Sequence, residues 1–126
     1  MTRARTLLLC LLVLGLTLAC FAPIEPRPDL GFDPASLPAG RIGVPYEATI
    51  RVVGHVTPVI GFVIAEGSLP GGLTLEYHER DDFARITGTP TQAGTFTFKL
   101  TAYCQGTNVS GQMGENEFTM VVIEQP

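Results

Sequence analysis

Apolar and polar residues alternate along most of the chain after residue 30, which is the pattern of β-strands that bury one face. The clearest segment is 95–104, where one face of the predicted strand carries Phe96, Phe98, Leu100, Ala102 and Cys104. The same alternation predicts four further inward-facing sets: Tyr46, Ala48, Ile50 and Val52; Ile60, Phe62 and Ile64; Leu73 and Leu75; and Phe118, Met120 and Val122. A weak strand over residues 30–37, interrupted by Pro34, and a short strand over residues 83–87 bring the total to about seven.

The segments between these strands favour tight turns and not helices. No long window after residue 25 keeps apolar residues at helical spacing. The chain contains 14 glycines and 10 prolines, a composition that suits many short strands joined by turns. In the segment 69–72, Pro70 fits the second position of a type II turn and Gly71 the third, where φ is positive. Antiparallel strands with one buried face each pack as two sheets, so we predict an all-β antiparallel sandwich.

The N-terminal segment does not follow this pattern, and we predict that residues 1–19 are removed as a signal peptide. Arg3 and Arg5 precede an apolar run of 12 residues, which is shorter than the roughly 20 that span a membrane but typical of a signal sequence. The run ends in LTLAC, which resembles the end of a bacterial lipoprotein signal. The resemblance implies cleavage before Cys20 and a diacylglyceryl group on its thiol. Ordinary signal cleavage near Ala22 and an uncleaved anchor are the alternatives.

The predicted mature chain divides into a tether and one domain. Residues 20–29 contain the lipid-bearing cysteine and three prolines, which disfavour helix and keep the segment extended. Residues 30–126 form the predicted sandwich. Two or more acyl chains on Cys20 would hold the protein firmly on a membrane. By analogy with lipoproteins, Phe21 after the cysteine favours the outer membrane of a bacterial cell envelope, on its periplasmic or surface face.

Net charge and cysteine content narrow the classes of function. Loss of Arg3 and Arg5 leaves six basic and twelve acidic residues, a net charge of about −6. Such a chain has no basic patch for nucleic acid or for anionic lipid headgroups. Once Cys10 has left with the leader and Cys20 is lipidated, Cys104 has no partner for an internal disulfide. Its place on an inward strand face predicts a buried, inert thiol.

Three segments in a fixed order resemble a bacterial domain family. GRIGVPYEATI, GSLPGGLTL and ITGTPTQAGTFTFKLTA are similar to the bacterial immunoglobulin-like domain related to the dystroglycan-type cadherin-like domains. The resemblance spans residues 37 to about 123 and implies an Ig-like or cadherin-like β-sandwich of a surface or secreted protein, without enzymatic activity. In cadherin-like relatives, an Asp that can bind calcium ends the strand that ends here in Cys104. A thiol is a poor ligand for calcium, so the sequence predicts no cofactor besides the lipid.

Acidic residues between the strands predicted at 73–75 and 83–87 are the candidates for a cation site. Calcium needs converging oxygen ligands, and the carboxylates available are Glu76, Glu79, Asp81 and Asp82. Their spacing does not follow an alternating calcium loop, and a solvated hairpin tip with arginines beside it accounts for them without a ligand. His55 and His78 lack neighbours at zinc-ligand spacing, and no catalytic motif is present.

The long loop after the strand at 95–104 is the predicted contact surface, because loops at one end of a sandwich commonly carry recognition. Its candidate contact residues are Gln105, Thr107, Asn108, Ser110, Gln112 and Glu115.

These features predict a lipid-anchored bacterial envelope protein whose single Ig-like domain serves protein binding, adhesion or scaffolding. Its expected partners are the membrane, through the lipid, and an unknown envelope protein or glycan. One alternative is a carbohydrate- or peptidoglycan-binding module, for which Tyr77 and Tyr103 could supply stacking faces. Another is a structural subunit of a larger envelope or export complex, joined through exposed edge strands.

Overall fold

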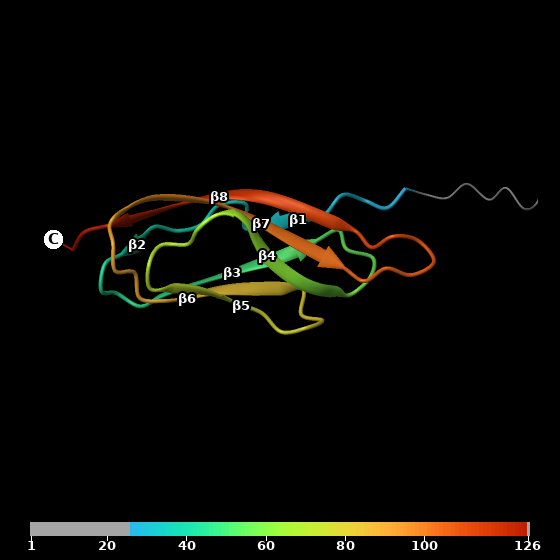
Figure 1. The fold of residues 1–126 in the computed structure, drawn as a ribbon, viewed down its shortest axis with the longest axis horizontal. Coiled ribbons are helices and arrows are strands. Elements are labelled where there is room, and N and C mark those ends of the chain that lie inside the picture. The colour runs from blue at the N-terminus through green and yellow to red at the C-terminus, as the bar shows by residue number, and fades with distance from the viewer. Residues whose placement is uncertain (1–25, 126) are drawn as a thin grey trace, which may run out of the picture.

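The computed structural model describes residues 26–125, which form two β-sheets packed face to face (Figure 1). The predictions about the leader and about lipid on Cys20 fall outside these residues. The strands are β1 (Gly31–Asp33), β2 (Gly40–Arg41), β3 (Tyr46–Val53), β4 (Val59–Gly67), β5 (Leu73–Glu76), β6 (Phe83–Gly88), β7 (Gly94–Cys104) and β8 (Met113–Ile123). In the described part of the chain, no helix is long and apolar enough to cross a membrane.

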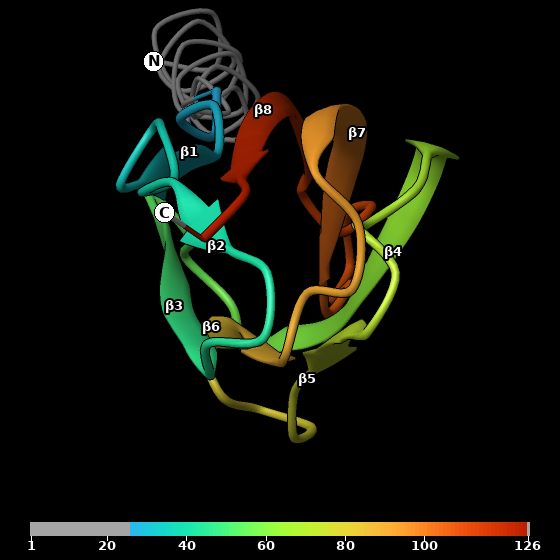
Figure 2. The ribbon, with the colours of Figure 1, turned by 90° about the vertical axis from the view of Figure 1, so that its left-hand side faces the viewer.

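One sheet has the strand order β1-β3-β6-β5 and the other β2-β8-β7-β4, as the view along the long axis shows (Figure 2). Neighbouring strands run antiparallel, except that β2 pairs parallel with β8. The expectation of purely antiparallel pairing is wrong at this place. Of the weak strand predicted over residues 30–37, only Gly31–Asp33 is a strand, β1, which pairs with β3. The chain then crosses to the other sheet, where β2, beyond the predicted strand, pairs with β8.

The strand faces predicted from alternation form most of the core between the sheets. Phe118 of β8 connects the two layers, because its ring stacks on Phe98 of β7 at 5.7 Å and meets the Phe32 ring of β1 edge-on at 6.2 Å. Burial of such aromatic rings is a main source of stability in a small domain. The other buried members include Tyr46, Ala48, Ile50, Val52, Leu73, Leu100, Ala102, Met120 and Val122.

Strand β4 departs from the predicted alternation. Val59 and Phe62 are buried, whereas Ile60 is 44% exposed. The register between β4 and β7 shifts between Val59 and Gly61, so one extra residue interrupts the alternation. The prediction that Ile60 lies inward with Phe62 and Ile64 is therefore wrong, because a bulge depends on how two strands pair and not on the apolar pattern of one.

The turn before β5 is displaced by one residue from its predicted place. The Leu73 N–H donates to the Pro70 carbonyl at 3.1 Å, so the turn runs from Pro70 to Leu73. Gly72 occupies the third position with φ of 89°, where a type II turn requires a positive value. The prediction that Gly71 occupies this position is wrong.

Gly72 also lies where the two most specific motifs of the sequence meet. Its carbonyl accepts a hydrogen bond from the Thr89 N–H at 3.1 Å, which joins LPGGL to ITGTP. A Cβ on Gly72 would lie 2.0 Å from the Thr89 oxygen, and one on Gly88 would lie 2.1 Å from the Gly72 oxygen. Both motifs need glycine because their backbones pass closer than any side chain allows.

Candidate functional site

The acidic residues predicted as a weak cation site lie on the β5–β6 hairpin, but they point to different partners. Asp82 faces β3, where it forms an ion pair with Arg51 at 2.5 Å and lies 3.9 Å from the His55 Nε2 atom. Its backbone carbonyl accepts the Val52 N–H at 2.7 Å. Asp82 therefore joins the end of the hairpin to β3. Nowhere in residues 26–125 do three His, Cys, Asp or Glu side chains gather as a metal-ligand cluster.

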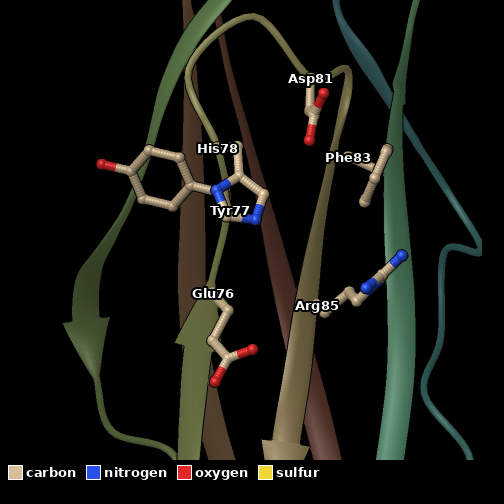
Figure 3. Close-up of a pocket in the computed structure, with 6 residues that line it drawn as sticks. All are labelled: Glu76, Tyr77, His78, Asp81, Phe83 and Arg85. Atoms are coloured by element: carbon tan, nitrogen blue, oxygen red, sulfur yellow. The ribbon is translucent and has the colours of Figure 1, made fainter.

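Two of the other acids border a shallow pocket beside the hairpin (Figure 3). The pocket has a volume of about 270 Å³ and is lined by Glu76, Tyr77, His78, Asp81, Phe83 and Arg85. The predicted candidate Glu79 is exposed and is not among these lining residues. The structure thus brings Glu76 and Asp81 to one pocket and separates them from Glu79 and Asp82.

Tyr77, Phe83 and Arg85 line the pocket, and Arg51 and Phe62 pack on them from outside the lining. Arg85 lies over the Phe83 ring with its guanidinium carbon 5.2 Å from the ring centroid, and Arg51 lies at 5.5 Å from the same ring. The Tyr77 ring packs on Phe62 of the opposite sheet at 5.5 Å. These groups can hydrogen-bond and stack on a small polar ligand, but they contain no nucleophile with an adjacent base.

The hairpin tip is fixed to the other sheet. The Arg80 N–H donates to the Val59 carbonyl of β4 at 3.1 Å, and the Asp81 N–H closes the turn on the His78 carbonyl at 3.2 Å. Arg80 has a φ of 76°, a left-handed conformation that is uncommon for a residue with a side chain. The tip was predicted as a solvated turn; it is exposed, and its backbone also links β5–β6 to β4.

The predicted contact loop is shorter than expected, because β8 begins at Met113. Glu115 lies inside β8, where it pairs with Thr101 of β7 and accepts a hydrogen bond from the Thr101 hydroxyl at 3.4 Å. Its assignment to the loop is wrong. Of the remaining candidates, Gln105, Thr107, Asn108 and Ser110 are exposed.

Gln112 holds three segments of the chain together. Its Oε1 atom accepts the Val56 N–H at 2.9 Å, and its Nε2 atom donates to the carbonyls of Pro28 at 2.6 Å and Gly54 at 3.0 Å. Arg27 adds hydrogen bonds to the Thr107 hydroxyl and the Ser110 carbonyl, each at 3.1 Å. The end of the tether is therefore bound to the β7–β8 loop.

We expect Gln112→Ala to destabilise the domain by about 1–3 kcal/mol, because it removes three hydrogen bonds and leaves their backbone partners unpaired. Hydrogen exchange should rise at Val56, whose N–H loses its acceptor. The matched control is Gln105→Ala at the other end of the loop, where the backbone and not the side chain forms the hydrogen bonds. The Gln105 N–H donates to the Pro58 carbonyl at 2.9 Å, and the Gln105 carbonyl accepts the Thr57 hydroxyl at 2.7 Å. Equal urea midpoints for the two variants would contradict the role of Gln112.

Cys104 is buried at the end of β7, as predicted from its strand face. Burial raises the pKa of its thiol, although the charge of Arg27 acts in the opposite direction. A raised pKa leaves less thiolate at a given pH, and thiolate is the reactive form.

We expect iodoacetamide at pH 8 to modify Cys104 at least about 10³-fold more slowly in the native protein than in urea, since only the unfolded fraction exposes it. Peptide mapping by mass spectrometry measures the rate at this residue. Comparable rates in both conditions would show that the thiol is accessible in the folded domain.

The strand order defines the class of protein. The sheets β1-β3-β6-β5 and β8-β7-β4 reproduce the A-B-E-D and G-F-C sheets of an immunoglobulin-like sandwich, with β2 added beside β8. The chain belongs to the family described as "Putative Ig domain", whose model matches residues 30–123. The Ig-like resemblance predicted from the sequence motifs is confirmed. Domains of this class are typically non-catalytic.

Two solved structures share the fold. The ASH/PapD-like domain 7 of human CEP192 has a TM-score of 0.54 and 13% identity, over 83% of this chain and 94% of that chain. The SrpA adhesin of Streptococcus sanguinis, solved as a mutant, has a TM-score of 0.53 and 14% identity, over 80% of this chain and 58% of that chain. At these identities the likeness concerns the fold alone. No sequence among curated proteins matches this chain significantly.

Sequence reasoning missed the residues that join the tether to the domain. Arg27 was treated as part of a free tether, and Gln112 as a contact residue. Single polar residues in loops carry no periodic signal, and their partners lie as far as 84 positions away in the chain. Only the three-dimensional structure could identify them.

Proposed function

We propose that this protein is a lipid-anchored component of the bacterial cell envelope whose Ig-like domain binds another protein, in adhesion or scaffolding. The observation that carries the proposal is the family match over residues 30–123, which assigns nearly all of the chain beyond the tether to one non-catalytic domain. Among residues 26–125, the ionisable side chains form ion pairs and line a pocket that has both charged and aromatic residues. They form no metal-ligand cluster in this part of the chain. Membership of a typically non-catalytic domain class supports binding as the activity.

The leader supports the placement at the envelope. Arg3 and Arg5, the apolar run and LTLAC follow the order of a lipoprotein signal, and Cys20 stands at the lipid position. The tether then provides a Pro-rich spacer before the domain. Intact mass of the protein purified from its host membrane tests the anchor. A chain that begins at Cys20 with added acyl mass supports the proposal, and an unmodified chain that begins beyond Cys20 overturns it.

Binding to a partner is tested by crosslinking in living cells, followed by identification of the crosslinked proteins. A fixed envelope protein recovered in stoichiometric amount would favour the structural-subunit form of the proposal. Strand β4 is the natural place for such a contact, because it lies at a sheet edge and, among the strands of residues 26–125, pairs with β7 alone. Absence of any reproducible crosslink to a protein would count against the binding role.

A carbohydrate-binding module is the second candidate, and the pocket beside β5–β6 favours it. Tyr77 and Phe83 supply aromatic surface, while Glu76, Asp81 and Arg85 supply hydrogen-bonding groups for hydroxyls. Saturable retention on peptidoglycan or a polysaccharide, lost in Arg85→Ala and kept in Thr87→Ala on the same strand, would support this candidate. Tyr103, the other predicted stacking residue, is exposed on β7 and is not a lining residue of this pocket.

A further inference from the structure

Exposed apolar side chains gather at the end of the sandwich from which the tether leaves. The β3–β4 loop and the β7–β8 loop meet there, and we call residues 54–58 and 105–113 the loop apex (Figure 1). The two loops are joined by the Gln105 N–H, which donates to the Pro58 carbonyl at 2.9 Å, and by the Thr57 hydroxyl, which donates to the Gln105 carbonyl at 2.7 Å. The apex is therefore one connected surface.

Three apolar side chains project from this surface. Val56 is 56% exposed, Val109 49% and Met113 58%. Val53, Ile60 and Tyr103, at the ends of the adjoining strands, are also exposed. Other exposed apolar side chains, such as Val63 and Val121, lie elsewhere on the strands, and the apex differs from them in that its three lie on two loops joined by hydrogen bonds. A contiguous exposed apolar surface marks a contact site.

The loop apex has no formally charged residue. Its sequence, GHVTP and QGTNVSGQM, contains no Asp, Glu, Lys or Arg, although the chain as a whole is acidic. The acids near this end of the domain are those of the β5–β6 hairpin and Asp29, whose carbonyl lies beside Gly54. The Arg27 guanidinium lies on this surface, bound to Thr107 and Ser110, and the apex itself adds no acidic side chain. A surface with apolar tips and without acidic side chains of its own loses little hydration when it enters a lipid headgroup layer.

The tether fixes where the apex can go. Arg27 and Pro28 are bound to the apex through Thr107, Ser110 and Gln112. Arg27 is seven positions after Cys20, so a fully extended chain between them reaches at most about 25 Å. A lipid on Cys20 therefore keeps the apex close to the membrane surface, and this high local concentration lets a weak apolar contact persist.

We propose that the loop apex docks on the lipid surface of the membrane that holds Cys20, with Val56, Val109 and Met113 among the headgroups and upper acyl chains. This inference rests on the lipid anchor of the proposed function. It assigns the predicted contact loop to the membrane. The opposite end of the sandwich, with the β2–β3, β4–β5 and β6–β7 turns, then faces the partner.

Tryptophan fluorescence tests the docking, because the chain contains no Trp and each variant has a single probe. The mature chain from Cys20 is coupled through that thiol to a maleimide lipid in phosphatidylcholine vesicles, with or without bromine on the acyl chains. Emission from Val109→Trp should shift to shorter wavelength on coupling and lose intensity with brominated lipid. Emission from Val44→Trp, in the β2–β3 turn at the opposite end, should do neither.

A third variant distinguishes docking of the apex from the closeness to the vesicle that the lipid coupling alone gives the domain. Val109→Trp combined with Val56→Asp and Met113→Asp should lose the quenching while circular dichroism shows the same folded domain. Equal Val109→Trp emission from the two kinds of vesicle would overturn the docking, as would equal quenching of Val44→Trp. Chemical coupling makes this result independent of acylation in the cell, so the intact mass of the natural protein reports separately on the anchor.

Discussion

Replacing Gly72 with alanine is expected to destabilise the domain by about 2–5 kcal/mol. The substitution puts a side chain on a residue with a left-handed conformation, and the new Cβ clashes with the backbone of another turn. Gly72 has a φ of 89°, and its new Cβ would lie 2.0 Å from the Thr89 oxygen. Relief of the clash requires β5 to move away from the turn after β6, which would break the hydrogen bond between Thr89 and Gly72. Urea unfolding followed by circular dichroism measures the loss.

Gly71→Ala is the matched control for this prediction. Its Cβ would meet only the Thr91 hydroxyl at 3.0 Å, a side-chain atom that can rotate away. Gly71 does not have a positive φ, so alanine also lowers the entropy of the unfolded chain, an effect worth about 0.4–1 kcal/mol in favour of folding. We expect the two variants to differ clearly in urea midpoint. Similar midpoints would refute the close approach of the two motifs.

Phe118→Ala is expected to cost about 3–5 kcal/mol, because it removes a ring that packs against both sheets and leaves a cavity. The ring is 1% exposed and contacts Phe98 and Phe32, which belong to different sheets. Small domains are stable by only about 5–15 kcal/mol, so this one substitution removes a large part of the total. Cys104 is a free thiol, so no disulfide in the described residues offsets the loss.

The control for Phe118→Ala is Glu117→Ala, one residue earlier on β8 and on the exposed face. A surface change of this kind usually alters stability by less than about 0.5 kcal/mol. Both variants are compared by urea unfolding at the same pH. A cost below about 1 kcal/mol for Phe118→Ala would show that the space collapses around the smaller side chain and that the ring does not bridge the sheets.

The proposed docking of the loop apex changes which face of the domain is expected to meet a partner. The long polar loop is the usual place for recognition in a sandwich, but here Arg27 and Gln112 tie it to the tether. A domain held by its apex presents the opposite turns and the open edge of β4. Crosslinks from the partner should therefore map to those regions, whereas crosslinks concentrated at residues 107–110 would contradict the docked orientation.

Alternation of apolar residues predicted the buried faces of β3, β7 and β8. Successive side chains of a strand point to opposite faces, so a strand that packs on one face has an apolar side chain at every second position. The same rule failed at Ile60, where the bulge against β7 inserts an extra residue. It also assigned the Thr101 side chain to solvent, whereas Thr101 is 1% exposed between its neighbours on β4 and β8. Errors of this kind arise from pairing between strands, which one strand's own sequence does not encode.

The acidic β5–β6 hairpin also combines a feature that the sequence predicted with features that only the assembled strands decide. Its existence followed from two apolar strands separated by polar residues, and the structure confirms the pairing of β5 with β6. The separate roles of its acids did not follow. Asp82 binds Arg51 of β3, while Glu76 and Asp81 line the pocket, and these partners become neighbours only when distant strands assemble.

The amino-acid sequence by itself determined the all-β sandwich and the inward faces of its main strands, and its motifs identified the Ig-like class. The strand faces are local properties, because they follow from side-chain alternation within one strand. The tertiary structure decided the register at Ile60, the meeting of Gly72 with Thr89 and the attachment of the tether through Gln112. Each of those depends on groups far apart in the chain whose distances are set only when the two sheets pack.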